Sequence, residues 1–444
     1  MLKHCKILLI LLTIISSFGF LFAEKKSGYT IITERELDKG LVYKNILYGK
    51  GRNKHSVHIL EADLMNPALS IEVMKSGDNV HHLGRLHDII NYADSINGEK
   101  EIPGAVNANF WRAYSNRPMG PTIINGEPAE IRRYKLWSSI FFDEMSLPVI
   151  DSFEIKGFLR IEDKEFDFGY VNRRHDSSGI VLYNRFAGDT IPFIMNRTIE
   201  KEFKQIQKNA AENDSTEEEI NLEDLRQQIE EEKRQSSQEF GTTKIILVYK
   251  GRPRINKQLK CRVIDVARGA VEMPENGCII SLGYDYECTI PKAGDEISIL
   301  FETNVHKEIV FFNAVSGTPR LVRDGNAKHE AYKEGSKGRR FIRRGLARTA
   351  IGVDEHNQKI FIVTVEHTQS SKRKRGATLS NMATIMKGIG CYNAMNLDGG
   401  GSSVMVIDSI NVMRESKPDY SRKISVGIGF EKKKLNLHNI FKTD

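Results

Sequence analysis

The sequence lacks the features that mark several special classes of protein. Its 444 residues include only 12 prolines and five cysteines, which excludes a collagen-like chain and a disulfide-dense mini-protein. No two cysteines form a CxxC pair, so a zinc knuckle or a thioredoxin-like site is disfavoured. The excess of basic residues is small, with 65 Lys and Arg against 58 Asp and Glu. This balance favours anionic partners weakly and does not indicate nucleic acid.

Long apolar runs are also missing, except near the N-terminus. Residues 7–22 are almost wholly apolar, Lys3 and Lys6 precede them, and Ala23 stands before a polar stretch. This pattern is typical of a secretory signal peptide spanning residues 1–23. A bilayer span needs about 20 apolar residues, so we predict cleavage near Ala23, with an uncleaved anchor as the alternative. We expect a secreted, periplasmic or cell-envelope protein that keeps no stable membrane span after cleavage.

Four cysteines follow the apolar run. An oxidising compartment would permit a disulfide between Cys278 and Cys288, which would close a hairpin. Their spacing alone does not prove that they pair.

The rest of the chain predicts an α+β fold: a mixed or antiparallel sheet core with a few packed helices. Alternating apolar residues predict strands between residues 57 and 73, and helical spacing predicts a helix over residues 83–96. Asn125-Gly126 is a favoured hairpin turn. Residues 151–300 predict a β-rich insertion. Within it, residues 199–239 are dense in charge and predict a helical or disordered excursion that adds no core element.

The last third contains the most informative segment. A helix is predicted over residues 378–390, with Thr378 as its N-cap, and a strand over residues 391–397. Asp398 and three glycines follow directly. Glycine permits positive φ and a close approach of backbone to another group, and successive N–H groups can form an anion-binding concavity. The alternative is a tight structural turn. A nucleotide phosphate loop is excluded, because no lysine follows in the required frame.

This segment belongs to a longer pattern. Residues 396–403 read Asn-Leu-Asp-Gly-Gly-Gly-Ser-Ser. Other landmarks occur in the same order along the chain, at residues 106–110, 120–127, 317–325, 348–354, 361–365 and 420–422. Together they resemble the phosphodiester glycosidase family over residues 57–430. The resemblance is weak in the insertion and absent from the charged excursion, and residues 431–444 form a polar tail.

The resemblance implies a secreted glycosidase that hydrolyses the sugar C1–O bond of a glycosyl-1-phosphodiester or a related anionic envelope glycan. The alternative is a non-catalytic glycan-binding or exopolysaccharide-associated envelope protein with the same pocket. No cofactor is expected. No metal site is expected either, because no carboxylate or cysteine completes a ligand set around His81, His82 and His87.

Cleavage of that bond requires a carboxylate near C1 and donors for the phosphate. We predict Asp398 and Glu366 as the catalytic carboxylates and Arg348 as a bidentate phosphate clamp. The amides of Asn107 and Asn109 suit sugar hydroxyl or acetamido groups. Further substrate contacts are predicted at Thr349, Gly399, Gly400, Gly401 and Ser402. Structural alternatives remain: Arg348 in a buried ion pair, Glu366 as a cap of its strand end, and the two asparagines as supports of neighbouring loops.

Overall fold

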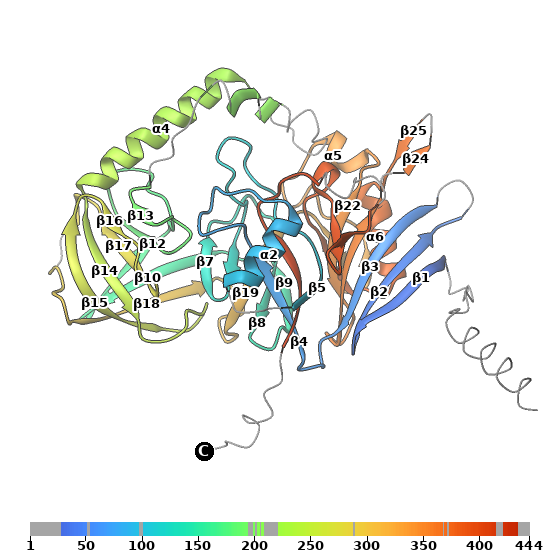
Figure 1. Ribbon diagram of the computed structural model, residues 1–444, viewed down its shortest axis with the longest axis horizontal. Coiled ribbons are helices and arrows are strands. Elements are labelled where there is room, and N and C mark those ends of the chain that lie inside the picture. Colours follow the sequence, from blue (N-terminus) through green and yellow to red (C-terminus); the bar gives the residue numbers. More distant parts are fainter. Residues whose placement is uncertain are drawn as a thin grey trace, which may run out of the picture.

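The computed structural model shows a molecule built largely from antiparallel sheets, in which helices are few (Figure 1). In the part of the chain that the structure describes, the ladders between the strands named below are antiparallel, as in the pairs of β22 with β23 and β26. The structure describes residues 28–50, 54–96, 101–193, 199, 202–204, 206–207, 221–286, 289–366, 368–370, 373–413 and 421–433. The predicted signal peptide and most of the polar tail lie outside these residues. Within them, no helix is long and apolar enough to cross a bilayer.

The largest sheet combines the two ends of the chain. Its strands, in spatial order, are β1 (Tyr29–Asp38), β2 (Leu41–Tyr48), β3 (His55–Asp63), β23 (Lys359–Val365), β22 (Arg348–Val353), β26 (Asn393–Asn396), β20 (Arg320–Arg323) and β21 (Asn326–Ala327). The predicted strands at 57, 348 and 359 are confirmed, and the register pairs Val57 with Val365 and Val365 with Arg348.

The two faces of this sheet are covered differently. On one face, Ala350 and Val363 pack against α6 (Leu379–Gly388), next to the short α5 (Arg339–Arg343). The predicted N-cap is confirmed, because the Thr378 hydroxyl accepts a hydrogen bond from the Asn381 N–H at 3.1 Å. On the other face, Ile351 packs into a core shared with both five-stranded sheets.

The first five-stranded sheet contains β28 (Ile410–Asn411), β27 (Met405–Ile407), β5 (Glu101–Asn107), β29 (Gly427–Lys432) and β4 (Leu69–Met74). The predicted helix is present as α2 (Leu86–Ile96). Its apolar residues recur at helical spacing, and Leu86, Ile89, Ile90 and Ala93 are buried against this sheet.

The second five-stranded sheet contains β7 (Glu127–Glu130), β6 (Thr122–Ile124), β19 (Phe311–Gly317), β8 (Ser138–Asp143) and β9 (Pro148–Asp151). The predicted β6–β7 hairpin turns at Asn125 and Gly126, whose φ angles are 54° and 85°. A Cβ at Gly126 would lie 1.8 Å from the Pro253 carbonyl oxygen, so only glycine fits there.

A seven-stranded sheet lies within residues 151–303. It contains β11 (Lys164–Phe168), β10 (Ile155–Ile161), β18 (Glu296–Thr303), β15 (Leu259–Arg268), β14 (Thr243–Tyr249), β17 (Gly277–Leu282) and β12 (Ile180–Tyr183), and it has its own apolar core. Two short ribbons complete the strands: β13 (Thr190–Ile191) with β16 (Val271–Glu272), and β24 (Thr368–Ser370) with β25 (Arg373–Arg375). Cys278 is a free thiol buried in this core, which corrects the suggested disulfide. Cys288 lies outside the described residues.

The charged excursion contains one long helix, α4 (Leu222–Gly241), which extends above the seven-stranded sheet toward the centre of the molecule (Figure 1). The expectation that this segment adds no core element is wrong. Leu225 and Ile229 are buried together with Ile206. Leu225 and Ile229 are one helical turn apart, so they lie on the same face of α4 and pack there, although the overall composition of the helix is polar.

The C-terminal end of α4 is fixed by a buried carboxylate. Glu239 is 2% exposed, and it accepts hydrogen bonds from the Arg174 Nε at 2.6 Å and the Tyr183 hydroxyl at 2.7 Å. The Lys244 Nζ lies 3.6 Å from the same carboxylate. Glu239 therefore neutralises two cations that are themselves buried.

We expect Glu239→Gln to lower the free energy of unfolding by about 3 kcal/mol, because it leaves Arg174 and Lys244 buried with less compensation. Urea unfolding of the full chain measures this effect. Glu231→Gln on the same helix is the matched control, since Glu231 is partly exposed and bonds only near neighbours on its own helix, Arg234 and Gln235. That change should alter stability by less than about 0.5 kcal/mol. Equal stability of the two variants would show that Glu239 does not anchor the helix.

Candidate active site

Three strand ends meet at one edge of the eight-stranded sheet. Because β22 runs antiparallel to both β23 and β26, its first residue lies beside their last ones. Glu366 directly follows β23, and Asp398 follows β26 after one intervening residue. Neighbouring strands are about 4.8 Å apart, so the two carboxylate-bearing backbones are separated by about 10 Å, with Arg348 between them.

Asp398 is held rigidly and almost completely buried. The residue is only 2% exposed. Its backbone N–H donates to the Ala108 carbonyl at 2.9 Å, and its Oδ1 accepts a hydrogen bond from the Gly399 N–H at 2.8 Å. Burial raises the pKa of Asp398 to about 6, although the Arg422 charge, the Ser402 hydroxyl and the Gly399 N–H lower it. This carboxyl group can therefore change its protonation state in mildly acidic solution.

Arg422 was not among the predicted site residues. Its guanidinium carbon lies 5.0 Å from the centre of the Trp111 ring, and its charge acts on Asp398. The sequence contained a signal for it, because Arg422 ends the last landmark of the family resemblance. Its separation of 24 residues from Asp398 in the sequence concealed this electrostatic interaction.

The glycines permit a tight turn beside Asp398. Gly400 has a φ of 60°, and a Cβ at Gly399 would lie 3.1 Å from the Ala347 carbonyl oxygen. The Gly400 N–H donates to that same oxygen at 2.8 Å. The N–H groups of Gly399 and Gly400 are thus already used within the protein, while Gly401 is exposed.

Asn107 and Thr349 support the Asp398 backbone. The Asn107 Nδ2 donates to the Asp398 carbonyl at 2.6 Å, and the Thr349 hydroxyl donates to the Asn107 Oδ1 at 2.8 Å. Ser402 is also buried, in the turn that follows the glycines. These contacts favour the structural alternative for Asn107, namely that it holds a neighbouring loop.

Asn109 is placed differently. Its Nδ2 donates to the Thr122 hydroxyl at 2.9 Å, but its buried Oδ1 has no hydrogen-bond partner. Asn396, which the sequence analysis did not select, also has a buried Oδ1 without a partner. Buried polar atoms are usually hydrogen-bonded, so both oxygens are available acceptors for a ligand.

Arg348 is completely buried on the sheet face that α6 covers, the same face as Ala350. Its Nε donates to the Ala377 carbonyl at 3.0 Å and its Nη2 to the Phe341 carbonyl at 2.6 Å, whereas Nη1 has no partner. Burial lowers the pKa of Arg348 to about 9. Among the described residues no carboxylate lies within ion-pair distance of it. The structural alternative of a buried ion pair therefore has no support there, and one side of the guanidinium remains available to an anion.

Glu366 lies on the opposite face, next to the buried His58. Its Oε1 lies 3.0 Å from the His58 Nε2, and the His58 Nδ1 lies 2.8 Å from the Tyr43 hydroxyl. The structure brings the backbones of Glu366, Arg348 and Asp398 to one sheet edge but engages the Glu366 carboxylate in a separate hydrogen-bonded chain. Its catalytic role stays a prediction.

Comparison with known proteins identifies the class to which this arrangement belongs. Residues 266–431 match the family model described as phosphodiester glycosidase. The resemblance seen in the sequence is thereby confirmed over this part of the chain. The matched range includes Arg348, Glu366, Asp398 and Arg422, whereas Asn107 and Asn109 precede it.

Particular relatives share a shorter segment. The chain is 32% identical over 106 residues to the N-acetylglucosamine-1-phosphodiester alpha-N-acetylglucosaminidase of Bos taurus and 31% identical over 106 residues to that of Mus musculus. Each match covers 22% of this chain, and about a fifth of the relative, 19% and 20% respectively.

Two crystal structures share the fold over most of the chain. A hypothetical protein from Synechocystis matches with a TM-score of 0.61 at 15% identity, covering 91% of this chain and 64% of that one. A Burkholderia pseudomallei K96243 protein that is described as exported matches with a TM-score of 0.53 at 14% identity, covering 86% and 75%. At these identities the similarity concerns the fold alone.

The raised pKa of Asp398 predicts that the difference in stability between the wild type and an Asp398→Asn variant depends on pH. A carboxyl whose pKa is higher in the folded state favours folding while it is protonated, and this advantage is lost as pH rises from about 4 to about 6. We expect Asp398→Asn, which cannot ionise, to match the wild type near pH 4 and to gain up to about 3 kcal/mol relative to it at pH 7.5.

Urea unfolding of both proteins at pH 4 and pH 7.5 measures this difference. A difference that does not change with pH would show that the carboxyl ionises normally in the folded state. An unfolded Asp398→Asn variant would show that Asp398 is a structural anchor whose charge the turn requires.

Proposed function

We propose that this protein is a secreted hydrolase that cleaves the sugar C1–O bond of a glycosyl-1-phosphodiester or a related anionic envelope glycan. The family match supports glycosidase activity in general. The observation that carries the finer proposal is the placement of a buried carboxylate and a buried guanidinium on neighbouring strand ends. The buried carboxylate of Asp398 lies one strand away from the buried guanidinium of Arg348, which keeps an unpartnered Nη1.

These groups suit the two ends of the bond to be broken. The phosphate is a good leaving group, so the reaction depends more on a carboxylate near C1 than on a strong general acid. Asp398, as base or nucleophile, must be ionised, and it is mostly so above pH 6. Arg348 would bind phosphate oxygens through its free side, and the oxygens of Asn109 and Asn396 would accept from sugar hydroxyl or acetamido groups.

The first substrate to test follows from the relatives. Both curated relatives are named for N-acetylglucosamine-1-phosphodiester, so a synthetic α-GlcNAc-1-phosphodiester is the appropriate probe. Secretion is proposed from the N-terminal sequence, and the exported fold neighbour is consistent with it.

A second candidate is a non-catalytic glycan-binding protein that uses the same pocket. The low exposure of Asp398 and the engagement of Glu366 by His58 favour this alternative. Turnover of the synthetic phosphodiester separates the two, because a binding protein would release no sugar.

We expect Asp398→Asn to lose turnover by roughly two or more orders of magnitude, because an amide keeps the shape but cannot act as base or nucleophile. In the wild type, kcat/KM should rise with pH and level off above about pH 6, where Asp398 is ionised. Released sugar, measured between pH 4 and 8, tests both. An activity that rises as pH falls through 6 would instead make this group a general acid. Full activity of a stable Asp398→Asn protein would move the search to Glu366.

Arg348→Lys keeps the charge but removes the planar fork. If Arg348 binds phosphate, kcat/KM for the phosphodiester should fall by about tenfold or more, since lysine cannot bind two oxygens in the same geometry. Arg343→Lys, at an exposed position of α5, is the matched control. Melting temperatures of both variants separate a binding defect from a folding defect. Unchanged kinetics in a folded Arg348→Lys protein would exclude the clamp.

A further inference from the structure

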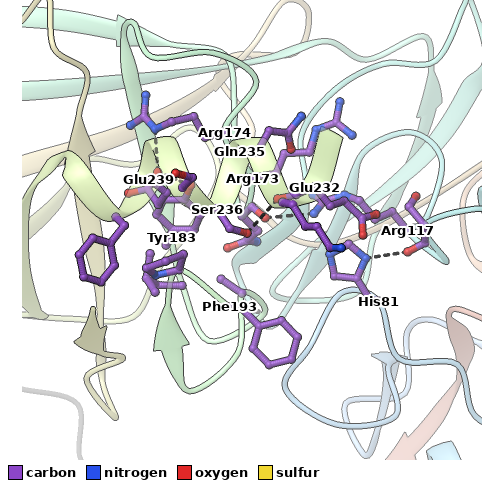
Figure 2. A pocket seen from close by; sticks show the side chains of 18 of the residues that line it. His81, Arg117, Arg173, Arg174, Tyr183, Phe193, Glu232, Gln235, Ser236 and Glu239 are labelled. Atoms are coloured by element: carbon purple, nitrogen blue, oxygen red, sulfur yellow. Dashed lines mark hydrogen bonds and ion pairs between the residues drawn. The ribbon is translucent and has the colours of Figure 1, made fainter. Parts of the chain in front are cut away.

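A cavity lies beneath α4, and neither Asp398 nor Arg348 lines it. Its volume is about 560 Å³, which is within the range of about 300–1,000 Å³ that is usual for small-molecule sites. One wall is α4, which contributes Gln235 and Ser236, and another carries Ser115, Arg117 and Arg173. In Figure 2, Arg117 lies at one end of the cavity and Glu239 at the other.

Two of the three arginines in its wall are largely satisfied. Arg174 donates through Nε to Glu239 at 2.6 Å and through Nη2 to the Ser281 hydroxyl at 2.9 Å. Arg117 donates through Nη1 to the Asn172 carbonyl at 3.0 Å, and its Nη2 lies 3.4 Å from the Glu130 carboxylate. Their charges are therefore balanced by protein carboxylates.

Arg173 is different. Its Nη2 is hydrogen-bonded to the ring of His175. Burial and the neighbouring arginines lower the pKa of that histidine to about 4. Among the residues that the structure describes, no carboxylate lies within ion-pair distance of Arg173. Its pKa is lowered to about 10, chiefly by burial and then by the charge of Arg117; the Glu130 carboxylate acts in the opposite direction, and the charges of Arg132 and Arg112 lower it further. This end of the cavity therefore has an excess of positive charge.

Three polar atoms on residues that line the cavity are buried without a hydrogen-bond partner. They are the Nε of Arg117, the Nε of Arg173 and the Oγ of Ser115. Arg117 is 1% exposed and Ser115 is 8% exposed, so bulk water does not solvate them freely. Three donors in one wall, two of them on guanidinium groups, form a site for a ligand that brings several acceptor oxygens and negative charge.

We propose that this cavity binds an anionic saccharide, with its phosphate or carboxylate group held by Arg173, Arg117 and Ser115. The volume exceeds that of a single oxyanion, and the α4 wall contributes neutral side chains suited to sugar hydroxyls, such as Gln235 and Ser236. Glu232 on α4 also lines the cavity and would repel an anion placed beside it.

The site differs from the Asp398 group, but the two are joined by one loop. Trp111, which contacts Arg422, lies four residues before Ser115. A ligand in the cavity would bind without using Asp398 or Arg348, which do not line it. The proposal does not rest on the proposed function, because an anionic saccharide could bind here whether or not the protein hydrolyses it.

Isothermal titration of the full chain tests this assignment, with glucose 6-phosphate, glucuronate and glucose as probes at constant ionic strength. We expect saturable binding of at least one anionic sugar and much weaker binding of glucose. The phosphate and carboxylate probes distinguish which anion is preferred. Arg173→Gln should weaken the binding by about tenfold or more, because it removes the unpaired charge. Arg160→Gln, an exposed arginine on β10 paired with Glu165, should leave it unchanged.

Two further variants keep the result interpretable. Ser236→Trp places a large side chain in the cavity from the surface of α4, and it should abolish binding even if Arg173→Gln does not fold. Asp398→Asn should bind the anionic probes as the wild type does. Absence of saturable binding, equal affinity in Arg173→Gln or Ser236→Trp, or loss of affinity in Asp398→Asn would each overturn the proposal.

Discussion

The antiparallel pairing of β22 with β23 on one side and with β26 on the other is the constraint on which the candidate site depends. Because β22 starts where its two neighbours end, residues far apart in the chain reach the same edge of the sheet. Arg348, Glu366 and Asp398 owe their proximity to this register. A shift of one residue would turn Arg348 away from α6 and into the core shared with the five-stranded sheets.

Register also divides the polar residues between two environments. Arg348 lies on the face that α6 covers, and Glu366 lies on the opposite face beside His58. The Arg348 guanidinium keeps an unpartnered Nη1, whereas the Glu366 carboxylate is hydrogen-bonded to His58, which in turn bonds the Tyr43 hydroxyl. Burial also changes the acid–base chemistry of Asp398 and Arg348. Removal of water raises the pKa of the Asp398 carboxyl group and lowers the pKa of the Arg348 guanidinium.

The same principle explains how the charged excursion joins the molecule. Most of α4 is polar, yet Glu239 is buried between Arg174, Tyr183 and Lys244. Removal of any one partner would leave an uncompensated charge in the interior, which makes the helix part of the fold and not an appendage. The helix also forms one wall of the cavity that contains Arg173, so the anchor at Glu239 positions that site as well.

The sequence determined the local elements and the family. Apolar spacing predicts α2 and α6, Asn125-Gly126 predicts its hairpin, and the ordered landmarks around Asp398 identify the phosphodiester glycosidase family, because these signals are short-range patterns or contiguous motifs. The sequence also predicted Asp398 as a site residue. It did not predict Arg422, whose charge acts on Asp398, or Asn396, whose buried Oδ1 has no hydrogen-bond partner. Only the tertiary structure decided that Asn107 supports a backbone, that Cys278 is free, and that α4 is anchored. Each of these depends on which distant side chains share a buried space, and burial determines whether a polar group is neutralised, left without a partner or shifted in pKa.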